Sequence, residues 1–211
     1  MHPMHPMFEQ LAAVRLVPVI VINDVSKAVP LAKALYDGGL PCAEITFRTP
    51  QAADAIRAIA NELPDMLLGA GTVLTTAQVD KALASGAKYM VAPGLNPEVV
   101  KYCQSLNVPM LPGVCTPSEV EQGLALGLSA LKFFPAEAAG GVNMLKSLAG
   151  PYGGVKFMPT GGITQTNLKT YLSIKSVFAC GGSWMVKDDL IAAGDFAKIT
   201  ELTREAVNTV A

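Results

Sequence analysis

The chain has 211 residues, of which 51% are hydrophobic, 16% charged and 6% aromatic, and its formal net charge at pH 7 is −1. This length suits one large domain, and the apolar content is too high for a disordered chain. With 16 basic and 17 acidic residues there is no basic excess to neutralise a phosphate backbone, so we expect no nucleic-acid partner. Apolar runs such as residues 16–22 are far shorter than the roughly 20 residues that span a bilayer, so we expect no membrane partner either.

The cysteines and histidines limit the chemistry that the chain can carry. Both histidines lie in the opening MHPMHP, which predicts a flexible tail over residues 1–7. No histidine remains within the fold for a Ser-His-Asp triad or a His-ligated zinc, and we expect neither a metal nor a cofactor. Four scattered cysteines without a preceding secretory signal predict reduced thiols in a cytoplasmic protein. These are Cys42, Cys103, Cys115 and Cys180.

One pattern repeats along the chain: a short apolar run rich in β-formers, a capping residue, an amphipathic stretch and a turn of small residues. The apolar runs begin roughly 20–25 residues apart, as expected of strand-loop-helix units in a parallel sheet. In chain order the predicted strands are residues 18–22, 43–47, 67–73, 88–92, 109–114, 130–134, 155–159 and 176–180.

The stretches between these runs predict helices. Thr49-Pro50, Asn96-Pro97 and Thr116-Pro117 each place a capping side chain before a proline that suits the first helical position. A further helix, from about residue 8 to residue 16, is expected before the first strand. Eight such units favour an α/β fold of the TIM (β/α)₈ barrel type, with residues 8–211 as a single domain. An open doubly wound sheet is the alternative.

Three polar side chains share one face of the second predicted strand. Glu44, Thr46 and Arg48 alternate there with Ile45 and Phe47, and strand side chains alternate between two faces. In a barrel the apolar face packs beneath the helices, so we expect an acid, a hydroxyl and a guanidinium to point inward. A structural ion pair at the end of the strand is the alternative, because buried charges are usually paired.

The sixth predicted strand carries one lysine, Lys132, in an otherwise apolar run. Burying an ammonium group without a partner is costly, so burial favours the neutral amine, which is the form that attacks a carbonyl. A nearby Arg48 would act in the same direction, and a nearby Glu44 would favour the charged form. The alternatives are a lysine that extends to solvent from the strand end and an ion-pair partner of Glu137.

Two glycine pairs follow the last two predicted strands, in the segments Thr160-Gly161-Gly162 and Gly181-Gly182-Ser183. In TIM barrels phosphate commonly binds at these two loops, where glycine lets backbone N–H groups approach the oxygens. One pair alone would indicate no more than a turn. Two pairs at these positions predict a phosphate site, to which the Ser183 hydroxyl adds a donor. Thr72, after the small residues 69–71, offers a hydrogen bond to a carboxylate.

Taken together, these segments resemble the 2-keto-3-deoxy-6-phosphogluconate (KDPG) aldolases, which include the bifunctional 4-hydroxy-2-oxoglutarate (KHG) aldolases. The resemblance covers nearly the whole chain beyond the tail, and KFFPAE together with EITFRT is its specific part. The matching stretches, in family order, are VPVIVI at 17–22, EITFRT at 44–49, GAGTVL at 69–74, VAPGLNP at 91–97, LPGVCTPSE at 111–119, LKFFPAE at 131–137, PTGGI at 159–163 and GGSW at 181–184.

The resemblance implies a class I aldolase, a lyase that works through a Schiff base. Lys132 would form the imine with the keto carbon of pyruvate, and Glu44 would be the general acid/base. Arg48 and Thr72 would hold the pyruvate carboxylate. The remaining substrate-binding residues that we expect are Pro93 and Phe134 around the pocket, Thr160 beside the sugar hydroxyls, and Gly161, Gly162, Gly182 and Ser183 at the phosphate.

The implied reaction cleaves KDPG to pyruvate and glyceraldehyde 3-phosphate, as in the Entner-Doudoroff pathway, and also KHG to pyruvate and glyoxylate. The expected partner is therefore a small phosphorylated keto-sugar acid, and the family suggests a homotrimer. Three other readings stay open at this point: an epimerase or isomerase on a phosphate-binding barrel, a non-catalytic barrel that binds a phosphorylated ligand, and a 2-keto acid decarboxylase.

Overall fold

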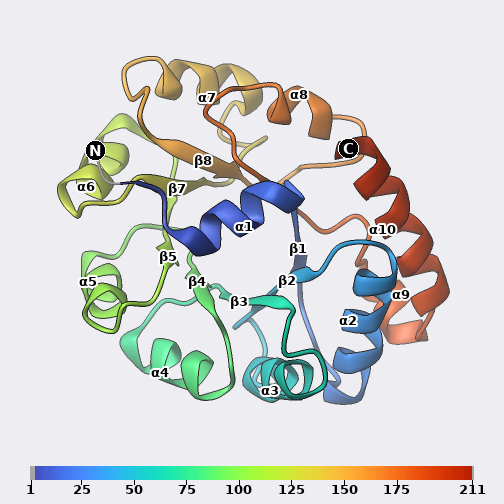
Figure 1. Ribbon diagram of the computed structural model, residues 1–211. Helices are drawn as coiled ribbons and strands as arrows, with labels where there is room; N and C mark the ends of the chain where they lie inside the picture. The colour runs from blue at the N-terminus through green and yellow to red at the C-terminus, as the bar shows by residue number, and fades with distance from the viewer. Residues whose placement is uncertain (1–2, 211) are drawn as a thin grey trace.

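The structure, a computed structural model, describes residues 3–210, so Met1 and His2 of the predicted tail lie outside the described residues. It is an α/β fold in which short parallel strands curl around a common centre and helices cover the outside (Figure 1). The strands are β1 Leu16–Ile20, β2 Cys42–Thr46, β3 Leu67–Gly71, β4 Tyr89–Val91, β5 Met110–Leu111, β6 Gly113–Val114, β7 Ala130–Phe133, β8 Lys156–Pro159 and β9 Cys180–Gly182.

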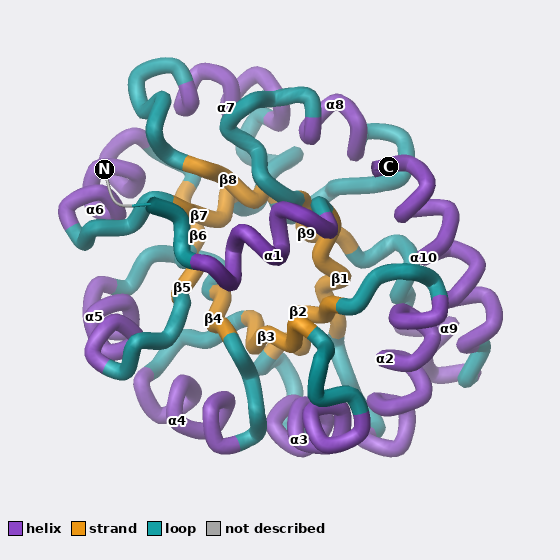
Figure 2. The backbone as a smooth tube through the Cα atoms, in the orientation of Figure 1, coloured by secondary structure: helices purple, strands orange, loops and turns teal. Residues whose placement is uncertain are grey.

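Helices connect successive strands, as Figure 2 shows by colour. None of the helices described between residues 3 and 210 is both long enough and apolar enough to cross a membrane. They are α1 Pro6–Val14, the short 3₁₀ helix η1 Val25–Lys27, α2 Ala28–Asp37, α3 Ala52–Glu62, α4 Thr76–Ala84, α5 Pro97–Ser105, α6 Pro117–Ala125, α7 Gly141–Ala149, α8 Leu168–Leu172, α9 Asp188–Ala193 and α10 Phe196–Val210.

The strands form two parallel sheets. The larger has the order β5-β4-β3-β2-β1-β9 and the smaller the order β6-β7-β8. Pro112, which has no N–H to give to a ladder, separates β5 from β6 within one predicted strand. At the other side, the isolated bridges Phe157↔Val177 and Thr160↔Gly181 link the β8 segment to the β9 segment. The prediction of parallel strands alternating with helices is confirmed in this form.

The first and last strands start at other residues than the sequence pattern predicts. β1 begins at Leu16 rather than at residue 18, because α1 already begins at Pro6 and the chain turns at Arg15, which has φ 62°. The last strand was expected at 176–180 and lies at Cys180–Gly182. It is the backbone of Gly181 that pairs with Val17, so one glycine pair belongs to a strand and not to the loop after it.

Helix α1 covers one end of the curled sheets. Figure 1 shows it lying across the middle of the ring of strands. Its side chains Phe8 and Leu11 are buried, and the Phe8 ring lies 6.3 Å from the ring of Phe178, which precedes β9. The helix therefore closes the end at which the strands begin. Functional groups must be sought at the opposite end, where the strands finish and where parallel sheets usually bind ligands.

Close packing inside the sheet depends on small residues in β3. The Tyr89 side chain is fully buried and lies directly over Gly69 on the neighbouring strand. A Cβ atom at Gly69 would be 2.3 Å from two ring carbons of Tyr89. The same strand faces Glu44 through the backbone pairing Glu44↔Gly69. Small residues in β3 thus leave room in the interior for the tyrosine and for a buried carboxylate.

We predict that Gly69→Ala destabilises the protein, because the new methyl group overlaps the Tyr89 ring. Overpacking of this kind costs about 1–3 kcal/mol, which corresponds to a fall of roughly 2–10 °C in Tm for a domain of this size. Thermal unfolding followed by circular dichroism measures the change. Gly153→Ala is the control, since nothing lies within 4 Å of a Cβ there. Equal melting temperatures for both variants would contradict this account of the packing.

Candidate active site

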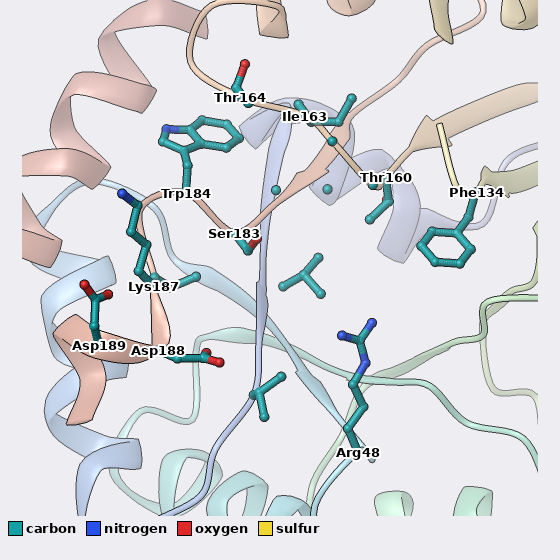
Figure 3. Close-up of a pocket in the computed structure, with 17 residues that line it drawn as sticks. Arg48, Phe134, Thr160, Ile163, Thr164, Ser183, Trp184, Lys187, Asp188 and Asp189 are labelled. Atoms are coloured by element: carbon teal, nitrogen blue, oxygen red, sulfur yellow. The ribbon is translucent and has the colours of Figure 1, made fainter. Parts of the chain in front are cut away.

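A cavity of about 810 Å³ opens at the end of the fold where the strands finish. Its walls come from segments that are distant in sequence: β1, Arg48 after β2, Phe134 after β7, the residues directly after β8, and β9 with the residues that follow it. Figure 3 shows Arg48 and Ser183 pointing into this space from different strands. The residues predicted from the sequence that line it are Arg48, Phe134, Thr160, Gly161, Gly162, Gly182 and Ser183.

Beneath the cavity lies a buried ion pair. Lys132 on β7 donates a hydrogen bond from Nζ to Oε1 of Glu44 on β2, at 3.5 Å. Glu44 is 0% exposed and Lys132 4% exposed. The Nζ atom also lies 5.3 Å from the centroid of the Phe134 ring, which lines the cavity. Among the described residues, the ion-pair partner of Lys132 is therefore Glu44 and not Glu137.

The carboxylate of Glu44 has one oxygen engaged and one free. Within the part of the chain that the structure describes, Oε2 is buried and has no hydrogen-bond partner. A buried polar atom left unpaired is costly, so such atoms are few in folded proteins and ask for an explanation. Gly71 makes room for the group, because a Cβ atom at that position would lie 2.2 Å from Oε1. The site thus holds a carboxylate that can accept a further hydrogen bond or a proton.

Arg48 stands at the rim, two residues beyond β2. Its Nε donates to the hydroxyl of Thr72 at 3.4 Å, and Figure 3 shows its guanidinium directed into the cavity. Thr72 has φ 56°, a left-handed conformation that few residues other than glycine adopt. Such strained residues gather at functional sites. The pair presents a cation and a hydroxyl group to a ligand, a combination suited to a carboxylate.

The two glycine segments lie side by side on the opposite wall. Thr160 and Gly181 form a backbone bridge, and a Cβ atom at Gly181 would be 2.4 Å from the Thr160 hydroxyl oxygen. Gly161 and Gly162 have φ 99° and 81°, which only glycine adopts without strain. The turn therefore depends on glycine for its conformation, and both segments bring unencumbered backbone to the cavity together with the exposed Ser183 hydroxyl.

Four predicted site residues are not among the described residues that line the cavity: Glu44, Thr72, Pro93 and Lys132. Three of them connect to it through neighbours, Lys132 and Glu44 through Phe134 and Thr72 through Arg48. Pro93 lies against the backbone opposite Lys132, because a Cβ atom at Gly113 would be 2.0 Å from the Pro93 carbonyl oxygen. The structure thus brings the predicted residues into one region, in two layers.

Sequence reasoning assigned no role to Trp184, although it is the only tryptophan of the chain and follows Ser183 directly. Its ring lies against Gly182, at 2.1 Å from the position of a Cβ there. Its indole N–H donates to Oε1 of Gln165 at 3.1 Å. Lys187 and Asp188 also line the cavity and were missed. Asp188 begins α9 and Lys187 directly precedes it, and no helix was predicted there from the sequence. A lone tryptophan beside a glycine pair, in contrast, was a usable signal.

Between residues 3 and 210 no group of three or more histidine, cysteine, aspartate or glutamate side chains is arranged to hold a metal ion. The chemistry that the described residues offer is that of an amine beside a carboxylate, a guanidinium at the rim and backbone N–H donors on the far wall. An amine in this setting can form a covalent imine with a carbonyl compound, while the other groups bind anionic ends of the same molecule.

Comparison with known proteins finds KDPG and KHG aldolases both by sequence and by structure. A family model described as KDPG and KHG aldolase matches residues 7–202. The 2-dehydro-3-deoxy-phosphogluconate aldolase of Treponema pallidum is 51% identical over 203 residues, covering 96% of this chain and 97% of its own length. The KHG/KDPG aldolase of Escherichia coli strain K12 is 49% identical over 191 residues, covering 90% of each chain.

A solved structure is similar over the same range. The crystal structure of a KDPG aldolase from Legionella pneumophila superimposes with a TM-score of 0.93 at 42% sequence identity, covering 96% of this chain and 98% of the other. In that crystal, pyruvate was captured at low pH as a covalent carbinolamine intermediate.

We predict that Glu44 and Lys132 are energetically coupled. In a double-mutant cycle with Lys132→Met and Glu44→Gln, the two changes should be non-additive by about 1–3 kcal/mol, because either single change leaves a buried group without its partner. Urea unfolding of the four proteins measures the coupling. The control is the exposed pair Arg57–Asp54, 52% and 61% exposed, for which about 0.5 kcal/mol or less is expected. Additive effects at Glu44 and Lys132 would contradict the pairing.

Proposed function

The chain belongs to the KDPG and KHG aldolase family, and from this premise we propose that it cleaves KDPG to pyruvate and glyceraldehyde 3-phosphate through a Schiff base on Lys132. It is a lyase of the class I aldolase type. One observation carries the proposal for the residue: a lysine amine buried beside a carboxylate, directly under a cavity whose walls offer a cation and glycine loops.

The first steps form the imine. The neutral Lys132 amine attacks the C2 carbonyl of the substrate, and the resulting carbinolamine loses its hydroxyl group as water. Glu44 supports both steps, because its Oε1 lies 3.5 Å from Nζ. It takes the proton that the lysine ammonium gives up to become neutral, and it then delivers this proton to the departing hydroxyl group, which leaves as water. The protonated imine is an electron sink for the next step. No external oxidant or reductant is consumed.

Glu44 then serves as the base in carbon–carbon cleavage. It takes the C4 hydroxyl proton, through a water, and the electrons of the C3–C4 bond move into the imine to give an enamine. Glyceraldehyde 3-phosphate leaves with its new carbonyl at C4. The proton returns to C3 of the enamine, and hydrolysis of the pyruvate imine frees Lys132. The unpaired Oε2 of Glu44 supports this role, because it leaves the carboxylate able to accept.

Arg48 and Thr72 hold the substrate carboxylate in this scheme. The guanidinium can donate two parallel hydrogen bonds to a carboxylate, which fixes the adjacent keto carbon beside the amine. Their mutual hydrogen bond at 3.4 Å aligns the two groups before the substrate binds. Pro93 and Phe134 shape the pocket around the reacting carbons, since Phe134 lines the cavity and its ring centroid lies 5.3 Å from the Lys132 Nζ atom.

The distal end of the substrate binds at the glycine loops. Gly161, Gly162 and Gly182 offer backbone N–H groups, and Ser183 offers its hydroxyl, for the phosphate. Thr160 is 5% exposed, lines the cavity where its backbone pairs with Gly181, and borders the place of the sugar hydroxyls. We propose KHG as a second substrate, since relatives such as the Escherichia coli protein carry both substrate names. It shares the keto acid end with KDPG and has no phosphate.

The same proposal extends to architecture and assembly. We propose a closed single-domain (β/α)₈ barrel. It is supported by the continuous chain from β5 through Pro112 to β6 and by the Thr160↔Gly181 bridge, which connect the two sheets on either side. We also propose a homotrimer, on the basis of the family resemblance.

A cytoplasmic location is supported by the four free cysteines of the chain. Burial raises the pKa of the Cys103 thiol to about 11, which keeps this thiol protonated.

We predict that borohydride in the presence of pyruvate adds a pyruvate-derived mass to Lys132. Borohydride reduces the imine to a stable secondary amine, so the label marks the residue that formed it. Peptide mass spectrometry locates the label. Lys156, the other lysine in the described strands, is the internal comparison. It is the first residue of β8 and lies at the end of the sheet away from the cavity. Labelling at another lysine, or an active protein that takes up no label, would overturn the assignment.

We predict that Glu44→Gln lowers kcat for KDPG by about 10²–10⁴, the usual contribution of a general acid/base. Binding of pyruvate should change far less, because the carboxylate clamp at Arg48 stays in place. Steady-state kinetics and pyruvate titration measure the two quantities. Glu98→Gln on the outer helix α5 is the matched control and should keep full turnover. If Glu44→Gln also kept full turnover, Glu44 would not be the acid/base.

A further inference from the structure

The loop that carries Gly161 and Gly162 is attached to the chain segment that follows Lys132. The N–H of Ala136 donates to the carbonyl of Thr160 at 2.8 Å, and the N–H of Glu137 donates to the carbonyl of Gly161 at 3.0 Å. These bonds continue the pairing of β7 with β8 beyond the strand ends. The position of the loop relative to Lys132 is therefore set by residues 136–137.

The side chain of Glu137 supports the loop from behind. A Cβ atom at Gly162 would lie 2.6 Å from Cγ and 2.7 Å from Cβ of Glu137, so the stem of the glutamate is packed against the glycine. A second contact reaches the same residue from the helix side, where the Asn167 amide donates to the Gly162 carbonyl at 3.0 Å. Gly162 is thus held between the β7 side and the α8 side.

A hydrogen bond closes this arrangement. The hydroxyl of Tyr171 on α8 donates to Oε1 of Glu137. The Tyr171 side chain is fully buried, whereas Glu137 is exposed. The buried phenol therefore holds the carboxylate of the more exposed glutamate in place. Burial, together with the hydrogen bond to the Glu137 carboxylate, raises the pKa of Tyr171 well above its usual value. The hydroxyl therefore remains a donor over the whole working pH range.

The reaction itself leaves this pair unexplained. Glu137 and Tyr171 do not line the main cavity but a separate one of about 450 Å³, together with residues of α7 and α8. A carboxylate behind a loop that binds a phosphate dianion also opposes that binding electrostatically. The hydrogen bond of Glu137 to the buried Tyr171 and its packing against Gly162 indicate that Glu137 holds the loop in position.

We infer that Glu137 and Tyr171 are positioning residues that hold the Gly161–Gly162 loop at the distance from Lys132 required by a phosphorylated substrate. The inference rests on the proposed function, because it takes Lys132 as the attachment point of one end of the substrate and the loop as the binding site of the other. A substrate without phosphate makes no demand on the loop. Loss of the Glu137–Tyr171 pair should therefore raise KM for KDPG and leave KM for KHG nearly unchanged.

The test compares both substrates in Tyr171→Phe, which removes only the hydroxyl. We expect KM for KDPG to rise about threefold to tenfold, the range that follows from one net hydrogen bond, with kcat within about twofold of wild type. KM for KHG should stay within about twofold. Tyr152→Phe is the matched control, because the Tyr152 hydroxyl also donates to a glutamate, Glu121, at 2.8 Å, away from the cavity.

Two changes at the glutamate complete the test. Glu137→Ala removes both the acceptor and the stem against Gly162 and should raise KM for KDPG at least as much as Tyr171→Phe. Glu137→Gln keeps the stem and an acceptor oxygen and should restore KM to within about twofold of wild type. Ser183→Ala provides the reference for loss of a direct phosphate contact.

The outcomes separate the inference from the function on which it rests. Unchanged KM for KDPG in Tyr171→Phe and Glu137→Ala overturns the inference while the proposed function stands. An equal rise of KM for both substrates also overturns it, because that result indicates general loosening of the fold. A wild-type protein that cleaves neither substrate overturns the proposed function and the inference together.

Discussion

The site depends on the burial of one charged pair in an apolar interior. Glu44 and Lys132 come from different sheets and meet at 3.5 Å, and neither charge could be buried alone at acceptable cost. Their meeting requires space, which Gly71 of β3 provides. It also requires a fixed distance between β2 and β7, which the tightly packed interior supplies. Stability and reactivity thus share the same few contacts.

Around this pair the fold arranges binding groups by strand order. Arg48 follows β2, which carries the acid, and Phe134 follows β7, which carries the amine. One glycine pair follows β8 and the other lies within β9, and the two segments are linked by a bridge between Thr160 and Gly181. The cavity therefore has a cation on the β2 side and glycine backbone on the β8–β9 side. The distance between the two sides is set by the sheets.

The alternation of strands and helices and the inward position of the charged residues could be predicted, because both follow from local sequence patterns. Alternation along one strand placed Glu44 on the inner face, and a lone lysine in an apolar run marked Lys132. The exact strand ends were not predictable, since the break at Pro112 and the pairing of Gly181 with Val17 are decided by partners distant in sequence. The bond between Glu137 and Tyr171 is of the same kind, because 34 residues separate the two side chains along the chain. No local sequence pattern predicts this hydrogen bond.

Helix α1 has a consequence for the order of events at the site. Because it covers the end where the strands begin, the cavity above the buried pair of Lys132 and Glu44 lies at the opposite end of the fold. In the proposed reaction the keto acid stays covalently attached to Lys132 until its imine is hydrolysed. The phosphorylated aldehyde is therefore released first and the keto acid second.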